Sequence, residues 1–403
     1  MNRFSIIAGI ILCFTSLSSL YSKAADTVSN QATKQQDEQA QSQQTVTATI
    51  TIKRLSKDDW EFEYQFSQEI DAFDFGPPVV QFRQDAWKPS TPAMKIISKA
   101  GSEVLQHEQG RFQRATIEVK SYHPFSHNQY VPMIHFSDGG VALFLGHLTG
   151  QVSIAGVSRP LKTRFIAHGL PGEKIVLPQK AQEGVGLFAY FGPQEPIVAS
   201  HGILVLDPLT PAWMREVLAN TTERVTASYA KSFERIPSEP AMIFFAIRDL
   251  HLKGYSISGG ALPGQLAYRL AGNESIIDKP ESRNRFTYMI AHELAHIWQS
   301  IPNRAWTSFP ESWINEGGAD AITTETLLRT GLWSKEAVTE FEEKLIKECD
   351  NTKDSVRIAY ACGFKRFKSY NTDVLQLWKK LMDESDRSST AYNETMIQAV
   401  LRK

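Results

Sequence analysis

The run from Ala291 to His296, Ala-His-Glu-Leu-Ala-His, limits the structures this chain can form more than any other stretch. If the run is helical, His292 and His296 are four residues apart and project from one face, where two imidazoles can bind one metal ion. Glu293 then lies beside them, next to whatever the metal holds. The run therefore predicts a metal-binding helix with a carboxylate at its site.

A second motif, Trp-Ile-Asn-Glu-Gly at 313–317, supplies a third ligand. A catalytic metal site needs three protein ligands and one open position. Nineteen residues separate Glu316 from His296, which is enough for a loop to return the chain as a second helix. Asp320 lies four residues beyond Glu316, on the same face, and can accept a hydrogen bond from the ring of a ligand histidine. The two motifs predict one zinc ion (Zn2+) per chain, bound by His292, His296 and Glu316.

These motifs resemble the signature of the gluzincin metallopeptidases, His-Glu-x-x-His followed at a distance by Glu-x-x-x-Asp. Both are most similar to the aminopeptidase N branch and its small relatives. The interval between the second His and the Glu is one residue longer than is usual in that branch, which leaves a neighbouring gluzincin family open. The resemblance implies a thermolysin-like catalytic domain and zinc-dependent hydrolysis of peptide bonds.

The resemblance also assigns catalytic roles. The zinc ion lowers the pKa of its water, and Glu293 takes the proton of that water and passes it to the leaving amine. Tyr360, in Tyr-Ala-Cys-Gly at 360–363, matches the tyrosine that donates to the developing oxyanion. An ordinary core aromatic is the alternative for Tyr360, which lies 44 residues beyond Glu316, closer than is usual in that branch.

A glycine-rich stretch before the metal helix is similar to the Gly-Ala-Met-Glu-Asn edge strand of aminopeptidase N relatives, in which the Glu holds the free amine of the substrate. Gly259, Gly260 and Ala261 cover its opening, but Pro263 stands where that Glu would be. The amine anchor is missing, so aminopeptidase and endopeptidase activity both remain open. The stretch is either an edge strand that lines the substrate or a turn in a mixed sheet.

Hydrophobic periodicity divides the rest of the chain into two domains. Apolar side chains alternate with polar ones in Val46–Ile52 and Trp60–Phe66, and short runs of this kind continue to about residue 205. This pattern predicts an antiparallel β-sandwich over residues 46–205. A helical period follows in Trp213–Tyr229, then a buried strand at 241–247. The predicted fold is α+β, with the catalytic domain over residues 206–403.

Further helices are predicted around the zinc motifs and after them. The metal helix ends before Pro302, and the Glu316 helix runs from about Ser312 to Gly331. Gly317 and Gly318 each cost that helix about 1 kcal/mol relative to Ala, which indicates either close approach of the metal helix or substrate, or tight packing. The later helices cover Ser334 to Lys347, Ser355 to Phe367, Asp373 to Met382, and Glu394 to Leu401.

The start of the chain has the features of a cleavable signal peptide, residues 1–25. Arg3 precedes an apolar run from Ile6 to Phe14, and Ser-Lys-Ala precedes Ala25. A membrane anchor is the alternative, but the run is well short of the roughly 20 apolar residues that a spanning helix needs. Residues 26–45 are rich in Gln, Ser and Ala, which predicts a disordered linker. We expect an exported protein, periplasmic or secreted, without a membrane span.

Cysteine content and charge add two expectations. Cys349 and Cys362 remain after removal of the signal, and in an oxidising compartment we expect them to form a disulfide close to Tyr360. Two unpaired thiols are the alternative. A net charge of −1 provides no field for nucleic acid, so the expected partner is a peptide or protein substrate. The sequence does not specify an oligomeric state.

Two other functions compete with zinc-dependent hydrolysis. A purely structural zinc site would have four protein ligands, mostly Cys and His, and would gain nothing from Glu293. An exported, catalytically inactive peptide-binding module on a gluzincin fold would explain the missing amine anchor. Because Glu293 is intact, the sequence favours a zinc metallopeptidase.

Overall fold

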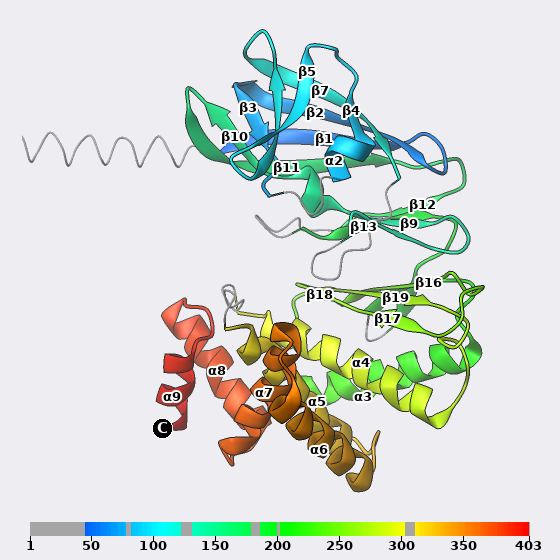
Figure 1. Ribbon diagram of the computed structural model, residues 1–403, viewed down its shortest axis with the longest axis vertical. Helices are drawn as coiled ribbons and strands as arrows, with labels where there is room; N and C mark the ends of the chain where they lie inside the picture. The colour runs from blue at the N-terminus through cyan, green and yellow to red at the C-terminus, as the bar shows by residue number, and fades with distance from the viewer. Residues whose placement is uncertain are drawn as a thin grey trace, which may run out of the picture.

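The structure is a computed structural model that describes residues 45–77, 82–121, 131–178, 186–199, 202–302 and 311–402. The signal peptide and nearly all of the linker predicted from the sequence lie outside these residues. Within them, the chain has a mixed α/β structure in which three sheets are stacked above a layer of helices (Figure 1). Among the described helices, none has both the length and the apolar content that crossing a membrane requires.

The first sheet contains nine strands and follows the predicted alternation, since every second residue of β1 and of most of β2 is buried. A short helix, α2 (Phe82–Ala86), lies beside its two edge strands. The strands, in spatial order, are β4 (Trp87–Pro89), β7 (Phe112–Lys120), β2 (Asp59–Ile70), β1 (Val46–Arg54), β11 (Val157–His168), β10 (Gln151–Ile154), β3 (Ala72–Asp74), β6 (Ser102–His107) and β5 (Met94–Lys99).

One pairing in this sheet differs from the antiparallel arrangement predicted from the sequence. β1 and β11 run parallel, with Val46 opposite Leu161, whereas β1 and β2 are antiparallel. The alternation of apolar residues reports that one face of a strand is buried, but it carries no information about strand direction. The sheet is therefore mixed.

The second sheet has four strands and lies between the other two sheets. Its order is β12 (Lys174–Val176), β13 (Phe188–Gly192), β9 (Val141–Phe144) and β8 (Met133–His135), and a 3-10 turn, η1 (Leu145–Leu148), follows β9. Val141 and Leu143 of β9 belong to the core shared with the first sheet, whereas Ala142 and Phe144 belong to the core shared with the third. The central strands of this sheet, β9 and β13, are thus buried on both faces.

The third sheet carries the helices on its other face. Its strands are β14 (Ile197–Ala199), β15 (Gly202–Leu206), β16 (Met242–Arg248), β19 (Gln265–Ala271) and β17 (Ser256–Ser258), and β18 (Ala261–Leu262) also pairs with β19. β15 runs parallel to β16, so this sheet begins before residue 206, where the sequence placed the domain boundary. An apolar run such as 202–206 has the same pattern in either sheet, which is why periodicity alone did not separate the domains.

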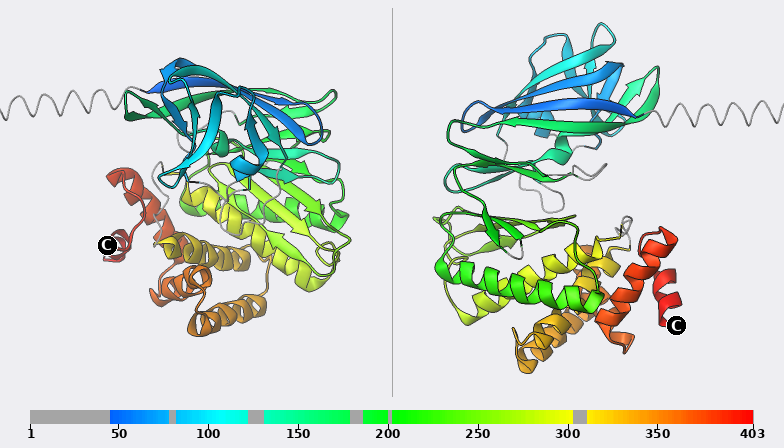
Figure 2. Two further views of the ribbon diagram at one scale, coloured as in Figure 1. Left: turned by 45° about the horizontal axis from the view of Figure 1, so that its top comes forward. Right: turned by 180° about the vertical axis from the view of Figure 1, so that it is seen from behind.

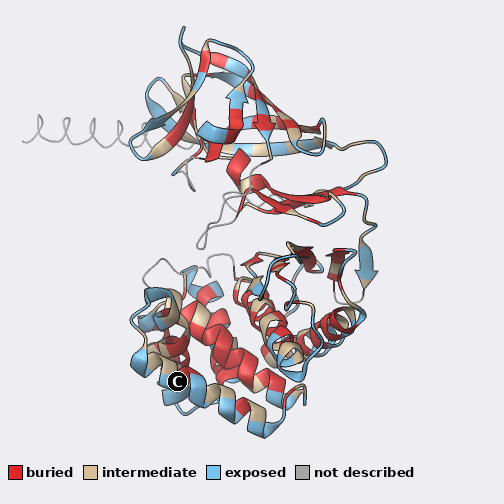
Figure 3. Cartoon of the chain, turned by 45° about the vertical axis from the view of Figure 1, so that its right-hand side comes forward, coloured by how far each residue is buried: buried red, intermediate tan, exposed pale blue. Residues whose placement is uncertain are grey.

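The helices lie below the third sheet, with their buried faces turned toward it and toward one another (Figures 2 and 3). The helices predicted around and after the zinc motifs are all present, and the side chains of Ser334 and Asp354 cap two of them. Their bounds are α3 (Ala212–Phe233), α4 (Pro280–Gln299), α5 (Ser312–Arg329), α6 (Lys335–Asn351), α7 (Ser355–Ser369), α8 (Val374–Ser388) and α9 (Glu394–Leu401).

Candidate active site

Helix α4 positions the two histidines of the first motif. It begins at Pro280, which suits the first turn because no N–H is needed there. Ile290 and Leu294 are fully buried in the core below the third sheet, and this packing fixes the rotation of the helix. His292 and His296, one turn apart, are consequently 4% and 6% exposed.

Glu316 of α5 completes a triangle of potential ligand atoms. The Nε2 atoms of His292 and His296 lie 3.2 Å apart, and the Oε2 of Glu316 lies 3.4 Å from the first and 3.3 Å from the second. Ligands about 2.0–2.1 Å from one tetrahedral zinc ion lie roughly 3.3 Å from one another. The three residues form a cluster that could hold a metal ion, and their geometry fits zinc.

Hydrogen bonds on the other side of each ring fix the histidine tautomers. The Nδ1 of His292 lies 2.7 Å from an oxygen of Asp320, and the Nδ1 of His296 lies 2.7 Å from the amide oxygen of Gln299. Both oxygens only accept, so each Nδ1 carries the proton and each Nε2 offers a lone pair. Glu316 Oε2 has no hydrogen-bonding partner among the described residues. Three lone-pair atoms that converge in this way call for a cation.

Two of these supporting residues were missed in the sequence. Tyr288 donates its hydroxyl to Asp320, and Gln299 donates its amide N–H to the carbonyl oxygen of Asn315 at 3.1 Å. Tyr288 lies four residues before His292, and Gln299 lies three residues after His296, so helical spacing alone places each beside its histidine. That spacing was the available signal.

Burial and charge set the protonation of the cluster. Burial alone lowers the pKa of His292, but the carboxylates of Asp320 and Glu316 outweigh it and raise that pKa well above its ordinary value. Burial likewise opposes the effect of Glu316 on His296, whose pKa is raised. Burial alone raises the pKa of Glu316, yet the two histidines hold it well below its ordinary value. The cluster thus strongly attracts positive charge.

Glu293 lies between the histidines and the glycine-rich stretch. Burial raises the pKa of its carboxyl group. A Cβ atom added to Gly259 would lie 3.1 Å from Oε1 of Glu293 and 3.0 Å from the ring of Tyr268. The backbone of the stretch therefore passes directly beside Glu293, and glycine is the residue that leaves room for it.

The glycine-rich stretch is an edge strand that ends in a turn. Gly260 exchanges two backbone hydrogen bonds with Ala267, at 3.1 and 3.0 Å, and Ala261 pairs opposite Leu266 in β19. Pro263 and Gly264 form the turn that leads into β19, with Gly264 at a φ of 75°. The stretch therefore contains an edge strand followed by a turn, and the strand is the part that lies beside Glu293.

Tyr360 of α7 lies against His292. Its ring stacks on that of His292, with centroids 5.6 Å apart and an interplanar angle of 17°. Burial, followed by the carboxylates of Glu316 and Glu293, raises the pKa of the Tyr360 hydroxyl far above its ordinary value. The hydroxyl therefore stays protonated and can donate.

A close crossing of α5 and α7 brings Tyr360 to this position. A Cβ atom on Gly317 would lie 2.3 Å from the carbonyl carbon of Gly363, and one on Gly363 would lie 2.5 Å from the carbonyl oxygen of Trp313. A Cβ atom on Gly318 would meet the indole of Trp378 at 2.3 Å. Of the two explanations considered for the paired glycines, helix packing is the one found, and its partners are α7 and α8.

A disulfide joins Cys349 of α6 to Cys362 of α7, as expected from the sequence. Between them, Arg357 forms two hydrogen bonds with Glu348, at 2.7 and 2.9 Å. The guanidinium carbon of Arg357 lies 5.1 Å from the ring centroid of Tyr360. The α6–α7 hairpin thus supports the far side of the tyrosine.

The site thus consists of His292, His296 and Glu316 on two helices, with Glu293 and Tyr360 beside them. It lies next to the edge strand of the third sheet. No protein-family model matches the chain, and no curated protein sequence matches it.

Comparison with solved structures identifies the fold. An aminopeptidase N family protein from Idiomarina loihiensis matches over 89% of this chain and 73% of its own, with a TM-score of 0.61 and 12% identity. An M1 zinc metallopeptidase from Deinococcus radiodurans matches over 89% and 90%, with a TM-score of 0.49 and 11% identity. Leukotriene A4 hydrolase from Saccharomyces cerevisiae matches over 89% and 64%, with a TM-score of 0.48 and 11% identity. The chain shares the fold of the aminopeptidase N family protein.

Proposed function

We propose that this protein is a zinc-dependent metallopeptidase of the gluzincin group, built as a β-rich N-terminal part followed by a thermolysin-like catalytic domain. The observation that carries the proposal is the triangle of lone-pair atoms from His292, His296 and Glu316, with sides of 3.2–3.4 Å. Its dimensions suit one zinc ion, and Glu293 adjoins it.

The three residues of the triangle would hold the ion, and Asp320 and Gln299 would keep the two imidazoles in the binding tautomer. When bound, zinc supplies positive charge that polarises a carbonyl and makes a neighbouring water more acidic. Structural zinc sites are closed by four protein ligands. The described residues offer three, which suits catalysis.

Glu293 would serve as the general base and then as the general acid. Its raised pKa brings its affinity for a proton closer to that needed at neutral pH, where such a group can both take and return one. It would accept a proton from the attacking water and deliver it to the leaving amine. Tyr360 would donate its hydroxyl proton in a hydrogen bond to the oxyanion.

The edge strand beside Glu293 would bind the substrate backbone. An extended peptide can add to an exposed sheet edge through main-chain hydrogen bonds, and the backbone at Gly259 passes directly beside the carboxylate of Glu293. Pro263 lies in the turn beyond the strand and provides no carboxylate for a free amine. The proposal is therefore peptide hydrolysis, without a commitment to the amino terminus of the substrate.

We also propose that the protein is exported. The disulfide between Cys349 and Cys362 supports this, because such bonds persist in oxidising compartments. Mass spectrometry of the mature protein should give a chain shortened by about 25 residues, the usual length range of a signal peptide. An intact amino terminus on the exported protein would contradict the cleavage.

The proposed activity is tested by incubating purified protein with a mixed peptide pool and identifying the products by mass spectrometry, with and without a chelator. We expect one zinc ion per chain and chelator-sensitive cleavage. Glu293→Gln should keep the metal but lose hydrolysis by several orders of magnitude, because it removes a proton acceptor and leaves the ligands intact. Near-normal turnover by this variant would contradict the role of Glu293, and full activity without metal would contradict the mechanism.

A further inference from the structure

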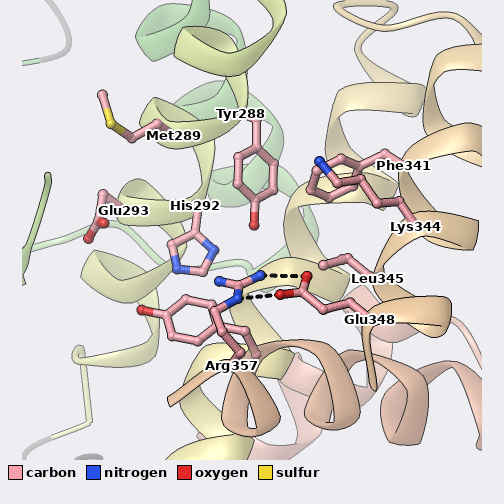
Figure 4. A pocket seen from close by; sticks show the side chains of 10 residues that line it. Tyr288, Met289, His292, Glu293, Phe341, Lys344, Leu345, Glu348 and Arg357 are labelled. Atoms are coloured by element: carbon pink, nitrogen blue, oxygen red, sulfur yellow. Dashed lines mark hydrogen bonds and ion pairs between the residues drawn. The ribbon is translucent and has the colours of Figure 1, made fainter. Parts of the chain in front are cut away.

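A cavity of about 220 Å³ opens beside His292 and Glu293, between α4, α6 and α7. This volume equals that of roughly seven water molecules in the liquid, so the cavity can hold the side chain of one amino-acid residue. Its lining is mostly apolar but includes charged side chains, and Figure 4 shows how these residues are arranged. The apolar lining consists of Tyr288, Met289, Phe341 and Leu345, and the charged lining beyond Glu293 consists of Lys344, Glu348 and Arg357.

Two cationic side chains, Lys344 and Arg357, line this cavity together with the carboxylates of Glu293 and Glu348. Arg357 uses Nε and Nη2 for Glu348, and its Nη1 has no hydrogen-bonding partner among the described residues. Figure 4 shows Arg357 between Glu348 and His292. Lys344 is exposed, and no described residue forms a salt bridge with it. Donors from both side chains therefore remain available to a ligand.

We infer that this cavity binds a carboxylate of the substrate next to the scissile bond. The carboxylate comes either from the carboxyl terminus or from an Asp or Glu side chain, and the carbon chain of the same residue lies against Tyr288, Phe341 and Leu345. The inference rests on the proposed peptidase function. Lys344 and the unused Nη1 of Arg357 can donate to a carboxylate, whereas both oxygens of the Glu348 carboxylate are already bound to Arg357 and are not free to hold an amine. This end of the site therefore favours a negatively charged group.

Binding to the zinc-loaded Glu293→Gln protein tests the inference without dependence on turnover. The probes are acetyl-Ala-Ala-Phe-Leu with a free carboxyl terminus, the same peptide as its amide, and a pair of amides that end in Glu or Gln. We expect the carboxylate member of at least one pair to bind about tenfold more tightly, as a charged hydrogen bond in a partly enclosed site contributes. The first pair reports a terminal carboxylate, and the second reports a side-chain carboxylate.

Adding Lys344→Met to this protein should reduce the preference to less than about threefold, while the affinity for the neutral peptides stays unchanged. Lys347→Met is the matched control, because Lys347 is exposed on the same helix but does not line the cavity. Equal binding within both pairs, no binding by any probe, or a preference that survives Lys344→Met would overturn the inference. Wild-type hydrolysis of the amides is measured separately. Its absence with every peptide would count against the proposed function and would leave the binding comparison valid.

Discussion

Reduction of the Cys349–Cys362 disulfide should lower turnover before the protein unfolds. The bond closes a loop with a sequence separation of 13 residues, for which the chain-entropy model gives roughly 3 kcal/mol. Whole domains have about 5–15 kcal/mol of unfolding free energy, so the fold should survive the loss. The effect on the α6–α7 hairpin should be larger than the effect on the whole fold, because Arg357 and Tyr360 both lie on α7 within the loop that the bond closes.

The size of the effect follows from the same estimate. If the α6–α7 hairpin loses about 3 kcal/mol relative to its open forms, their population rises about a hundredfold. Displacing the Tyr360 hydroxyl costs at most what loss of one oxyanion donor costs, about 10²–10³ in kcat. We therefore expect kcat to fall, by at most about 10²–10³, while far-ultraviolet circular dichroism stays unchanged.

A phosphine reductant suits this assay because it contains no thiol that would bind zinc. Turnover, zinc content and circular dichroism are followed across the titration, and thiols are counted in denatured protein before and after it. The double variant Cys349→Ser with Cys362→Ser is the matched control and should behave like reduced wild type at every reductant concentration. Two free thiols before reduction, or unchanged turnover after complete reduction, would refute the reasoning.

Three further predictions concern the His-His-Glu cluster and the crossing of α5 and α7. Asp320→Ala should weaken zinc binding about 10–100-fold in a chelator competition, and unchanged affinity would mean that Asp320 does not orient His292. The pKa values of His292 and His296 are raised. Protons therefore compete with zinc for both imidazole rings at pH values above the ordinary histidine pKa of about 6.5. Zinc affinity should therefore still rise between about pH 7 and 8, and an affinity independent of pH in that range would contradict this. Gly363→Ala should destabilise the fold by about 1–3 kcal/mol and lower kcat more than it raises KM. If the variant has the melting temperature and kinetics of the wild type, the close crossing of α5 and α7 is not needed for stability or activity.

The sequence predicted the helices and the proximity of His292, His296 and Glu316 well because both depend on short-range geometry. His292 and His296 are neighbours on any helix, and Ser334 caps its helix through a local contact. The triangle with Glu316 required only that a second helix return beside the first. Each of these features can be derived from a few consecutive residues.

Features that depend on distant contacts were not derivable in the same way. The parallel pairing of β1 with β11 joins strands about a hundred residues apart, and alternation of side chains is the same for either direction. The partner of Gly317 is Gly363, on a different helix, so the sequence left packing and substrate contact equally open. The acceptor role of Gln299 depends on its orientation by Asn315, which no periodicity reports.

The middle sheet has a practical consequence for anyone who would cut this protein into parts. A recombinant fragment that starts at residue 206 would lack nearly all of β15 and would expose Phe244 of β16 to water. It would also lack Phe188, whose backbone N–H donates to the side-chain amide oxygen of Gln265 and whose carbonyl oxygen accepts from the amide N–H, so the buried amide of Gln265 would lose both bonds. Such a fragment should express as insoluble material. The part of the chain that carries His292, His296 and Glu316 therefore depends on the middle sheet and cannot be transferred alone to another protein.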